Sequence, residues 1–157
     1  MPNSTIAADQ DAIVSEIHIA APPERVFKAI TDAGELSQWF RSPECPVKIW
    51  EMDPRVDGAY RYATQKGSIV VNGVSEFECH GHITEFDPPR LLAYTWYANW
   101  HDDPTRRTLV RWELTPRQDG THVKVTHSGL AKLPVARKDY GGGWPEVVQM
   151  LKQHLLG

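Results

Sequence analysis

The chain has 157 residues, of which 41% are hydrophobic and 24% are charged, a balance typical of one globular domain. Its 17 Lys and Arg against 20 Asp and Glu give a formal net charge of −3, and no basic stripe stands out, which argues against a nucleic-acid partner. Neither a signal peptide nor a membrane span is predicted, because no basic start with an apolar core and no long apolar run occurs. We therefore expect a cytoplasmic protein with a flexible N-terminal tail, residues 1–12, and a single domain, residues 13–157.

The first structured part of the chain is predicted to be a strand followed by two short helices. Apolar and polar residues alternate over residues 13–19, which is typical of a strand with one buried face. Two prolines end this strand, and the stripe of Val26, Phe27 and Ile30 then predicts a helix. A glycine is expected to break that helix, so residues 35–40 form the second one.

From residue 47 onward the pattern changes to the two-residue period of β-strands. The pair Asn72-Gly73 readily supplies the positive φ angles of a type I′ turn and predicts a hairpin there. The expected strands are residues 47–52, 59–64, 69–71, 74–84, 91–100, 109–115 and 122–127. These segments predict an antiparallel meander of about six strands after the helices.

The last stretch of the chain is predicted to be an amphipathic helix on which the sheet packs. Its apolar residues recur at helical steps and form one stripe: Trp144, Val147, Val148, Leu151 and Leu155. Pro145 suits a first helical turn, so we expect the helix to begin near Trp144, after a mobile or sharply bent connection at glycines 141–143. A helix with one apolar stripe needs a surface to cover, and a curved antiparallel sheet supplies it, which makes the fold α+β.

The order of these elements resembles the START-like, SRPBCC or Bet v 1-like helix-grip fold. Four local patterns are similar to the activator of heat-shock protein 90 ATPase homologue-like domains: APPERVFKAITDAGELSQWF, ITEFDPPRLLAYTW, VKVTHSGL and GWPEVVQMLKQHL. The resemblance extends over residues 13–156 and implies a curved sheet of about six or seven strands wrapped around a long C-terminal helix. It also implies a cavity between the sheet and the helix.

Two features depart from that family. Its members commonly have one longer helix where the glycine triplet 141–143 is expected to interrupt the helix here, which affects the depth and closure of the pocket. The chain also lacks a second, N-terminal domain like that of the eukaryotic co-chaperone. The resemblance therefore does not imply a full co-chaperone role.

Strand parity and the helix stripe together indicate which side chains face the expected cavity. The candidates are Tyr60, Tyr62, Phe77, Tyr94, Trp96, Trp112, His127, Trp144, Val148 and Leu151. Any one such aromatic residue fills a core more often than it contacts a ligand, but buried Tyr hydroxyl and Trp N–H groups require partners. A mixed apolar and hydrogen-bonding pocket is therefore predicted.

Residues with catalytic or metal-binding chemistry are few. His127 has a side-chain type that titrates near ~6.5 and could move protons, although a structural histidine at a strand end is the favoured interpretation. His80 and His82 share one strand face, but no carboxylate or cysteine completes a ligand spacing, so neither a metal nor a cofactor is expected. Cys45 and Cys79 are expected to be reduced thiols.

Three other motifs favour structural roles. Ser128 lies outside any nucleophile elbow, and no carboxylate is placed to orient a histidine beside it, which argues against a Ser/His hydrolase. The glycine triplet follows no strand and lacks a Lys-Ser/Thr sequel, so a hinge is favoured over a phosphate loop. Asp102 and Asp103 lie in a charged loop, predicted to be a solvated turn, with a gate or a partner contact as the alternative.

The sequence therefore leads to one leading hypothesis and two alternatives. The leading hypothesis is a non-catalytic binding protein that holds a small hydrophobic or aromatic molecule between the sheet and the C-terminal helix. The second is a chaperone-activator-type interaction domain whose partner is a chaperone or another protein. The third is a cyclase or hydrolase on the same fold, which would require a polar acid and base pair inside the pocket.

Overall fold

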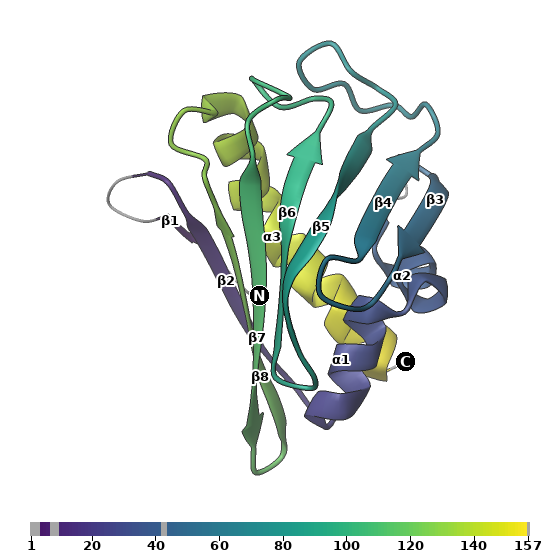
Figure 1. The fold of residues 1–157 in the computed structure, drawn as a ribbon, viewed down its shortest axis with the longest axis vertical. Helices are drawn as coiled ribbons and strands as arrows, with labels where there is room; N and C mark the ends of the chain where they lie inside the picture. Colours follow the sequence, from purple (N-terminus) through teal and green to yellow (C-terminus); the bar gives the residue numbers. More distant parts are fainter. Residues whose placement is uncertain (1–3, 7–9, 42–43, 157) are drawn as a thin grey trace.

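The computed structural model describes residues 4–6, 10–41 and 44–156, and has an α+β fold (Figure 1). Its elements in chain order are β1 (Ser4–Ile6), β2 (Ile13–Ile19), α1 (Pro23–Thr31), α2 (Ala33–Trp39), β3 (Val47–Met52), β4 (Ala59–Thr64), β5 (Glu78–Asp87), β6 (Leu91–Ala98), β7 (Thr108–Arg117), β8 (Gly120–Ser128) and α3 (Pro134–Leu156). No helix within the described residues is both long and apolar enough to cross a membrane.

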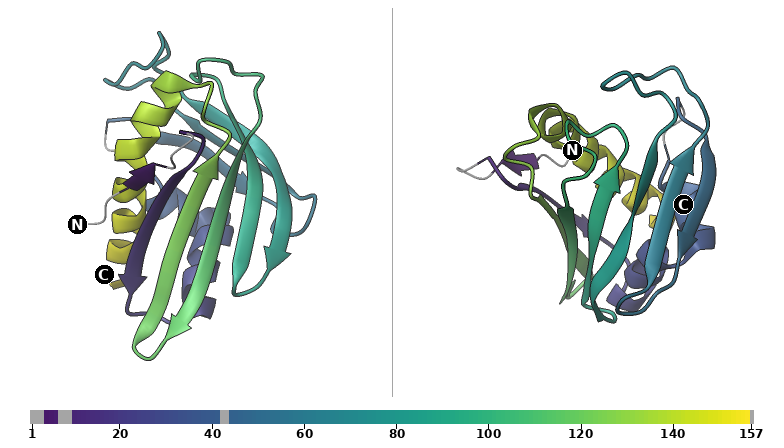
Figure 2. Two further views of the ribbon diagram at one scale, coloured as in Figure 1. Left: turned by 90° about the vertical axis from the view of Figure 1, so that its left-hand side faces the viewer. Right: turned by 45° about the horizontal axis from the view of Figure 1, so that its top comes forward.

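The strands form one antiparallel sheet in the order β1-β2-β8-β7-β6-β5-β4-β3. The sheet is curved and does not close, and α3 lies across its concave face (Figures 1 and 2). The helices α1 and α2 connect β2 to β3, which lie far apart in the sheet. This arrangement confirms the expected helix-grip architecture.

The sheet has eight strands, whereas six or seven were expected. The additional strand is β1, in which Ser4 pairs with Ser15 of β2 and the two hydroxyl groups share a hydrogen bond of 2.8 Å. Residues 4–6 thus form an edge strand within the segment that was expected to be a loose tail. The predicted tail also includes residues 1–3 and 7–9, which lie outside the described residues.

The two short helices are confirmed, but the break between them lies two residues earlier than predicted. It falls at Asp32, whose backbone is extended (φ −90°, ψ 117°), and Gly34 lies inside α2. The Asp32 carboxylate accepts a hydrogen bond from the Glu35 backbone N–H at 3.0 Å. Because this satisfies a donor that the first turn leaves unpaired, Asp32 starts the second helix.

Helix α3 begins at Pro134, not near Trp144, and glycines 141–143 do not interrupt it. Asp102, in the loop between β6 and β7, caps its first turn by accepting hydrogen bonds from the backbone N–H groups of Val135 and Ala136, both at 3.0 Å. The buried stripe also starts earlier than expected: Ala136, Tyr140, Trp144, Val148 and Leu151. Packing along this stripe and the cap outweigh the low helix propensity of the glycines and of Pro145.

The Asn72-Gly73 turn is confirmed, but the strand expected over residues 69–71 is reduced to a single bridge, and the one expected over residues 74–84 begins later, at Glu78. Asn72 and Gly73 have φ angles of 50° and 78°, and Val71 and Val74 exchange two backbone hydrogen bonds of 2.9 Å. Residues 65–77 therefore form a loop that extends beyond the end of β4.

Candidate ligand-binding pocket

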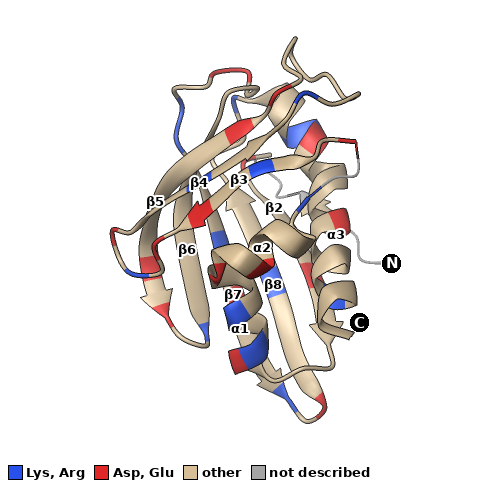
Figure 3. Ribbon diagram, turned by 90° about the vertical axis from the view of Figure 1, so that its right-hand side faces the viewer, with Lys and Arg blue, Asp and Glu red and all other residues tan. Residues whose placement is uncertain are grey.

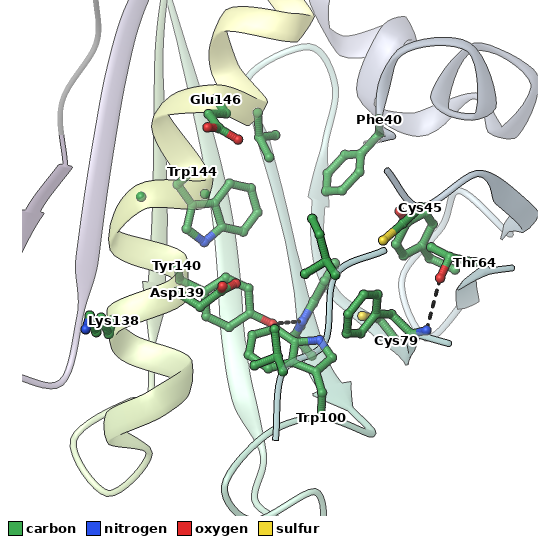
Figure 4. A pocket seen from close by; sticks show the side chains of 18 of the residues that line it. Phe40, Cys45, Thr64, Cys79, Trp100, Lys138, Asp139, Tyr140, Trp144 and Glu146 are labelled. Atoms are coloured by element: carbon green, nitrogen blue, oxygen red, sulfur yellow. Dashed lines mark hydrogen bonds between the residues drawn. The ribbon is translucent and has the colours of Figure 1, made fainter. Parts of the chain in front are cut away.

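The structure contains a pocket of about 610 Å³ between the N-terminal half of α3 and the strands β4, β5 and β6 (Figure 4). Seven aromatic side chains line it: Phe40, Tyr62, Phe77, Trp96, Trp100, Tyr140 and Trp144. Smaller residues complete the wall: Cys45, Thr64, Ile69, Val71, Cys79, Val135, Gly142, Gly143 and Val147. Ile69 and Val135 are 39% and 40% exposed, so they mark the mouth of the pocket.

The ten cavity candidates divide into two groups. Four of them line the pocket: Tyr62, Phe77, Trp96 and Trp144. The other six are buried in the core outside its wall: Tyr60, Tyr94, Trp112, His127, Val148 and Leu151. The strand parity was thus right about which side chains point inward, but side chains fill much of the space beneath the helix.

The sequence interpretation missed three aromatic residues of the wall. Phe40 follows α2, Trp100 follows β6, and Tyr140 lies in the part of α3 that was expected to be irregular. Tyr140 lies four residues before Trp144, so extending the helix stripe backward by one step would have found it. Trp100 ends the strand predicted over residues 91–100 and shares the parity of Trp96, so continuing that parity would have found it. Phe40 ends the helix predicted over residues 35–40, to which strand parity does not apply.

His127 lies in a hydrogen-bond network that determines its protonation state. Its Nδ1 accepts a hydrogen bond from the Trp144 Nε1–H at 3.1 Å, and its Nε2 lies 2.8 Å from the hydroxyl of Thr108. That hydroxyl donates its proton to the backbone carbonyl of Trp96 at 2.6 Å. Since an indole nitrogen can only donate, Nδ1 carries no proton and Nε2–H donates to Thr108.

His127 is therefore a neutral structural residue. It is 0% exposed, and burial, with a smaller contribution from His101, places its pKa well below the ordinary value. Both ring nitrogens are occupied by protein partners. Within the described structure His127 therefore has no free ring nitrogen with which to take a proton from a molecule in the pocket.

A second polar group lies where Tyr140 meets the loop after β6. The Tyr140 hydroxyl accepts a hydrogen bond from Trp96 Nε1–H at 2.7 Å and shares another, of 2.8 Å, with His101 Nε2. Burial lowers the pKa of His101 to about 4, against the opposing effect of Asp102. His101 Nδ1 is buried and has no hydrogen-bond partner among the described residues.

The rim of the pocket carries charges of both signs, with acidic groups in excess. Lys138, Asp139 and Glu146 of α3 lie along it. Burial of the carboxyl and repulsion from Glu146 raise the pKa of Asp139, although the residue as a whole is exposed. On the face drawn in Figure 3 acidic and basic residues are interspersed and form no basic stripe.

The two cysteines belong to the pocket wall as free, buried thiols. Burial raises the pKa of both Cys45 and Cys79, so both thiols remain protonated near neutral pH. His80 stacks on Tyr97 with ring centroids 5.2 Å apart. Within the described parts of the chain, no group of three or more His, Cys, Asp and Glu side chains is arranged to hold a metal ion.

Asp102 has a structural role that its charged loop did not reveal. Burial works to raise the pKa of its carboxyl, but the hydrogen bonds from Ala136 and Val135 outweigh this effect and the pKa is lowered. The carboxylate thus fixes the start of α3 beside the pocket mouth. The prediction of a merely solvated turn is wrong for Asp102, whereas Asp103 makes local hydrogen bonds, with Thr105 and Arg106.

Residues 20–156 match the family model described as activator of Hsp90 ATPase homolog 1-like protein, and the chain belongs to this family. Solved structures share its fold. A protein from Rhodobacter sphaeroides is 21% identical, with a TM-score of 0.80, over 99% of this chain and 97% of that one. A Chromobacterium violaceum protein is 24% identical, with a TM-score of 0.74, over 91% and 96%.

A protein from Mesorhizobium loti is 28% identical, with a TM-score of 0.68, over 92% of this chain and 96% of that one. A comparison with proteins of curated function found no significant match. The comparisons therefore define the family and the fold of this chain, and the pocket must be interpreted from its own residues.

Proposed function

We propose that the protein binds a small, apolar, aromatic molecule in the pocket between α3 and the sheet, without changing it chemically. The observation that carries this proposal is the pocket of about 610 Å³ walled by seven aromatic side chains. Its size lies within the ~300–1,000 Å³ typical of small-molecule sites, and its lining is mainly apolar with a few polar groups. Flat rings on several sides suit a flat ligand.

The state of the titratable groups supports binding in preference to turnover. His127 has both nitrogens occupied by protein groups. The thiols of Cys45 and Cys79 are held in their protonated, weakly nucleophilic form. A nucleophile together with a base that activates it is the usual requirement for covalent catalysis, and the described wall offers no such pair.

Native mass spectrometry of the purified protein, followed by titration with fatty acids, flavonoids and small polyketides, tests the proposal. Trp96, Trp100 and Trp144 line the pocket and serve as fluorescence reporters. We expect saturable changes in tryptophan emission that persist in Trp112→Phe, because Trp112 is buried outside the wall. The absence of both a copurified molecule and any saturable response would overturn the proposal.

A second candidate is a protein-interaction domain of the chaperone-activator type. Membership of the family favours it, as do the apolar residues Ile69, Val70 and Val135, which are 39%, 63% and 40% exposed. ATP hydrolysis by an Hsp90-class chaperone, measured with and without this protein, tests it. Stimulation that survives a variant with a blocked pocket would assign the activity to the outer surface.

A further inference from the structure

The six tryptophans are not equally satisfied in their hydrogen bonding. Five indole N–H groups each donate to a protein acceptor, at distances of 2.7–3.2 Å: those of Trp39, Trp50, Trp96, Trp112 and Trp144. Trp100 is the exception, since its Nε1–H meets no acceptor among the described residues. Of the three tryptophans that line the pocket, Trp96 and Trp144 donate within the protein, and Trp100 keeps a donor that a ligand could engage.

Trp100 is held firmly in the pocket wall. It is 6% exposed, and its ring lies 5.0 Å from that of Tyr140 and 6.3 Å from that of Phe77, measured between centroids. Its backbone carbonyl accepts a hydrogen bond from the Asn72 side chain at 2.8 Å. Figure 4 shows the ring at the edge of the pocket, directed into it. The donor is therefore fixed in place before any ligand arrives.

The tyrosine hydroxyl groups also divide into those with a hydrogen-bond partner in the protein and those without one among the described residues. Tyr60 donates to the carbonyl of Thr95 at 2.6 Å, and the hydroxyls of Tyr94 and Tyr140 each accept from a tryptophan. Tyr62 is 9% exposed and lines the pocket, yet its hydroxyl has no partner among the described residues. Unpaired indole and hydroxyl groups thus occur on the pocket wall, whereas those of Tyr60, Tyr94 and Trp112 behind it are paired.

The charges at the rim restrict the ligand further. Asp139 and Glu146 outnumber Lys138, and burial, with a smaller contribution from the negative charge of Glu146, raises the pKa of Asp139. A carboxylate or phosphate on the ligand would add a further negative charge to this rim. Among the described residues that line the pocket Lys138 is the one cation and there is no arginine to pair with an anion, so the surroundings favour an uncharged ligand.

We propose that the pocket selects uncharged, flat molecules that carry a carbonyl oxygen, and that Trp100 Nε1–H donates a hydrogen bond to that oxygen. This inference rests on the proposed binding function and specifies its ligand class. A purely hydrocarbon ligand would displace water from the indole N–H and leave it unpaired. A carbonyl compound replaces the lost hydrogen bond to water with one to its own oxygen, so the unpaired indole N–H favours carbonyl compounds over hydrocarbons.

Three probes with one ring skeleton test the proposal by isothermal titration calorimetry: 9-fluorenone, fluorene and fluorene-9-carboxylate. We expect 9-fluorenone to bind about two- to tenfold more tightly than fluorene, the range that one neutral hydrogen bond supplies. The carboxylate should bind more weakly than fluorene. Tighter binding of the carboxylate than of 9-fluorenone would overturn the preference for an uncharged ligand.

The variant Trp100→Phe keeps an aromatic ring and removes the donor. It should bring the affinity ratio of 9-fluorenone to fluorene close to one, while Trp112→Phe, outside the wall, leaves the ratio unchanged. An unchanged ratio in Trp100→Phe, or equal affinities in the wild type, would overturn this inference and leave the binding function standing. Failure of fluorene and 9-fluorenone to bind, together with the absence of a copurified molecule and of any saturable response to the wider ligand panel, would overturn the binding function as well.

Discussion

The two ends of the sheet–helix interface differ in how tightly their side chains pack and in how many of their polar atoms have hydrogen-bond partners within the protein. The packed region, formed by Tyr94, Trp112, His127, Val148 and Leu151, has side chains no more than 3% exposed. Its polar atoms are paired within the protein, for example Trp112 Nε1–H with the Tyr94 hydroxyl at 2.9 Å. In the pocket region, formed by the wall residues described above, the same kinds of side chain surround open space and leave donors unpaired.

This difference separates the part of the interface that stabilises the fold from the part that is available to a ligand. One helix, α3, covers both regions, and its buried stripe continues without a break from Ala136 to Leu151. At the pocket the helix carries glycines 141–143, of which Gly142 and Gly143 line it, and a Cβ atom added to any of the three would have open space around it. Small residues on the helix preserve the space that large residues fill further along it.

The largest expected effect is the loss of a side chain from the packed region. Leu151 is 0% exposed, so Leu151→Ala should lower the free energy of unfolding by about 2–5 kcal/mol through lost burial and the cavity left behind. Val147 is on the same helix but lines the pocket and is half-buried, so Val147→Ala should cost about 1 kcal/mol or less. Urea denaturation of both variants makes the comparison, and equal midpoints would contradict it.

Removing one hydroxyl group from each region should show the next largest contrast. Thr108→Val would leave His127 Nε2–H without an acceptor and should cost about 1–3 kcal/mol. Tyr62→Phe removes a hydroxyl that has no protein partner in the described structure, so its cost should stay within about 0.5 kcal/mol. Thermal unfolding of the two variants measures this difference, and a large loss in Tyr62→Phe would mean that its hydroxyl is paired after all.

The Asp102 carboxylate connects the loop beside the pocket to the start of α3, so removing it should destabilise mainly the first turn of that helix. Asp102→Ala should cost about 0.5–2 kcal/mol at pH 7, as the loss of a helix cap does. Because the folded state lowers the pKa of this carboxyl, its contribution is present above the unfolded pKa of about 3.9 and is lost as the pH falls through the folded pKa.

Two measurements follow for this variant. The stability difference between wild type and Asp102→Ala should shrink in acid, and amide hydrogen exchange at Val135 and Ala136 should become faster in the variant at pH 7. A difference in stability that grows as the pH falls would contradict the assigned role.

The smallest expected effect is a gain in stability. Gly143→Ala and Gly141→Ala should each raise the free energy of unfolding by about 0.5–1 kcal/mol, because alanine restricts the unfolded chain and the folded structure has room for its methyl group. Chemical denaturation detects a change of this size. Destabilisation by either substitution would show that α3 is not a regular helix at the glycines.

The fold could be predicted from local patterns because most of its strands and helices bury one face at a regular period. The start of α3 could not, because its cap, Asp102, lies 33 residues from Val135 in the sequence and is brought there only by the folded sheet. The weak helix propensity of the glycine triplet was therefore given too much weight. The four-residue spacing of Ala136, Tyr140 and Trp144 correctly indicates a helix that continues through the glycines.

The pocket was predictable only in part for a related reason. Parity identifies which side chains point inward, but it does not show whether they meet other side chains or open space. His127 and Trp112 fill the core, whereas Trp96 on the neighbouring strand reaches the wall. In the structure α2 ends at Trp39 and β6 ends at Ala98, so the positions of Phe40 and Trp100 depend on packing just beyond these elements.

The most direct test of ligand binding in the pocket region is a comparison of two matched variants, Gly143→Leu and Gly141→Leu. Both sites have open space for a Cβ atom, but only Gly143 lines the pocket. Calorimetric titration with 9-fluorenone should show at least tenfold weaker binding to Gly143→Leu, with Gly141→Leu binding like the wild type and both variants folded. Equal affinity of the two variants would contradict the assignment of the pocket as the binding site.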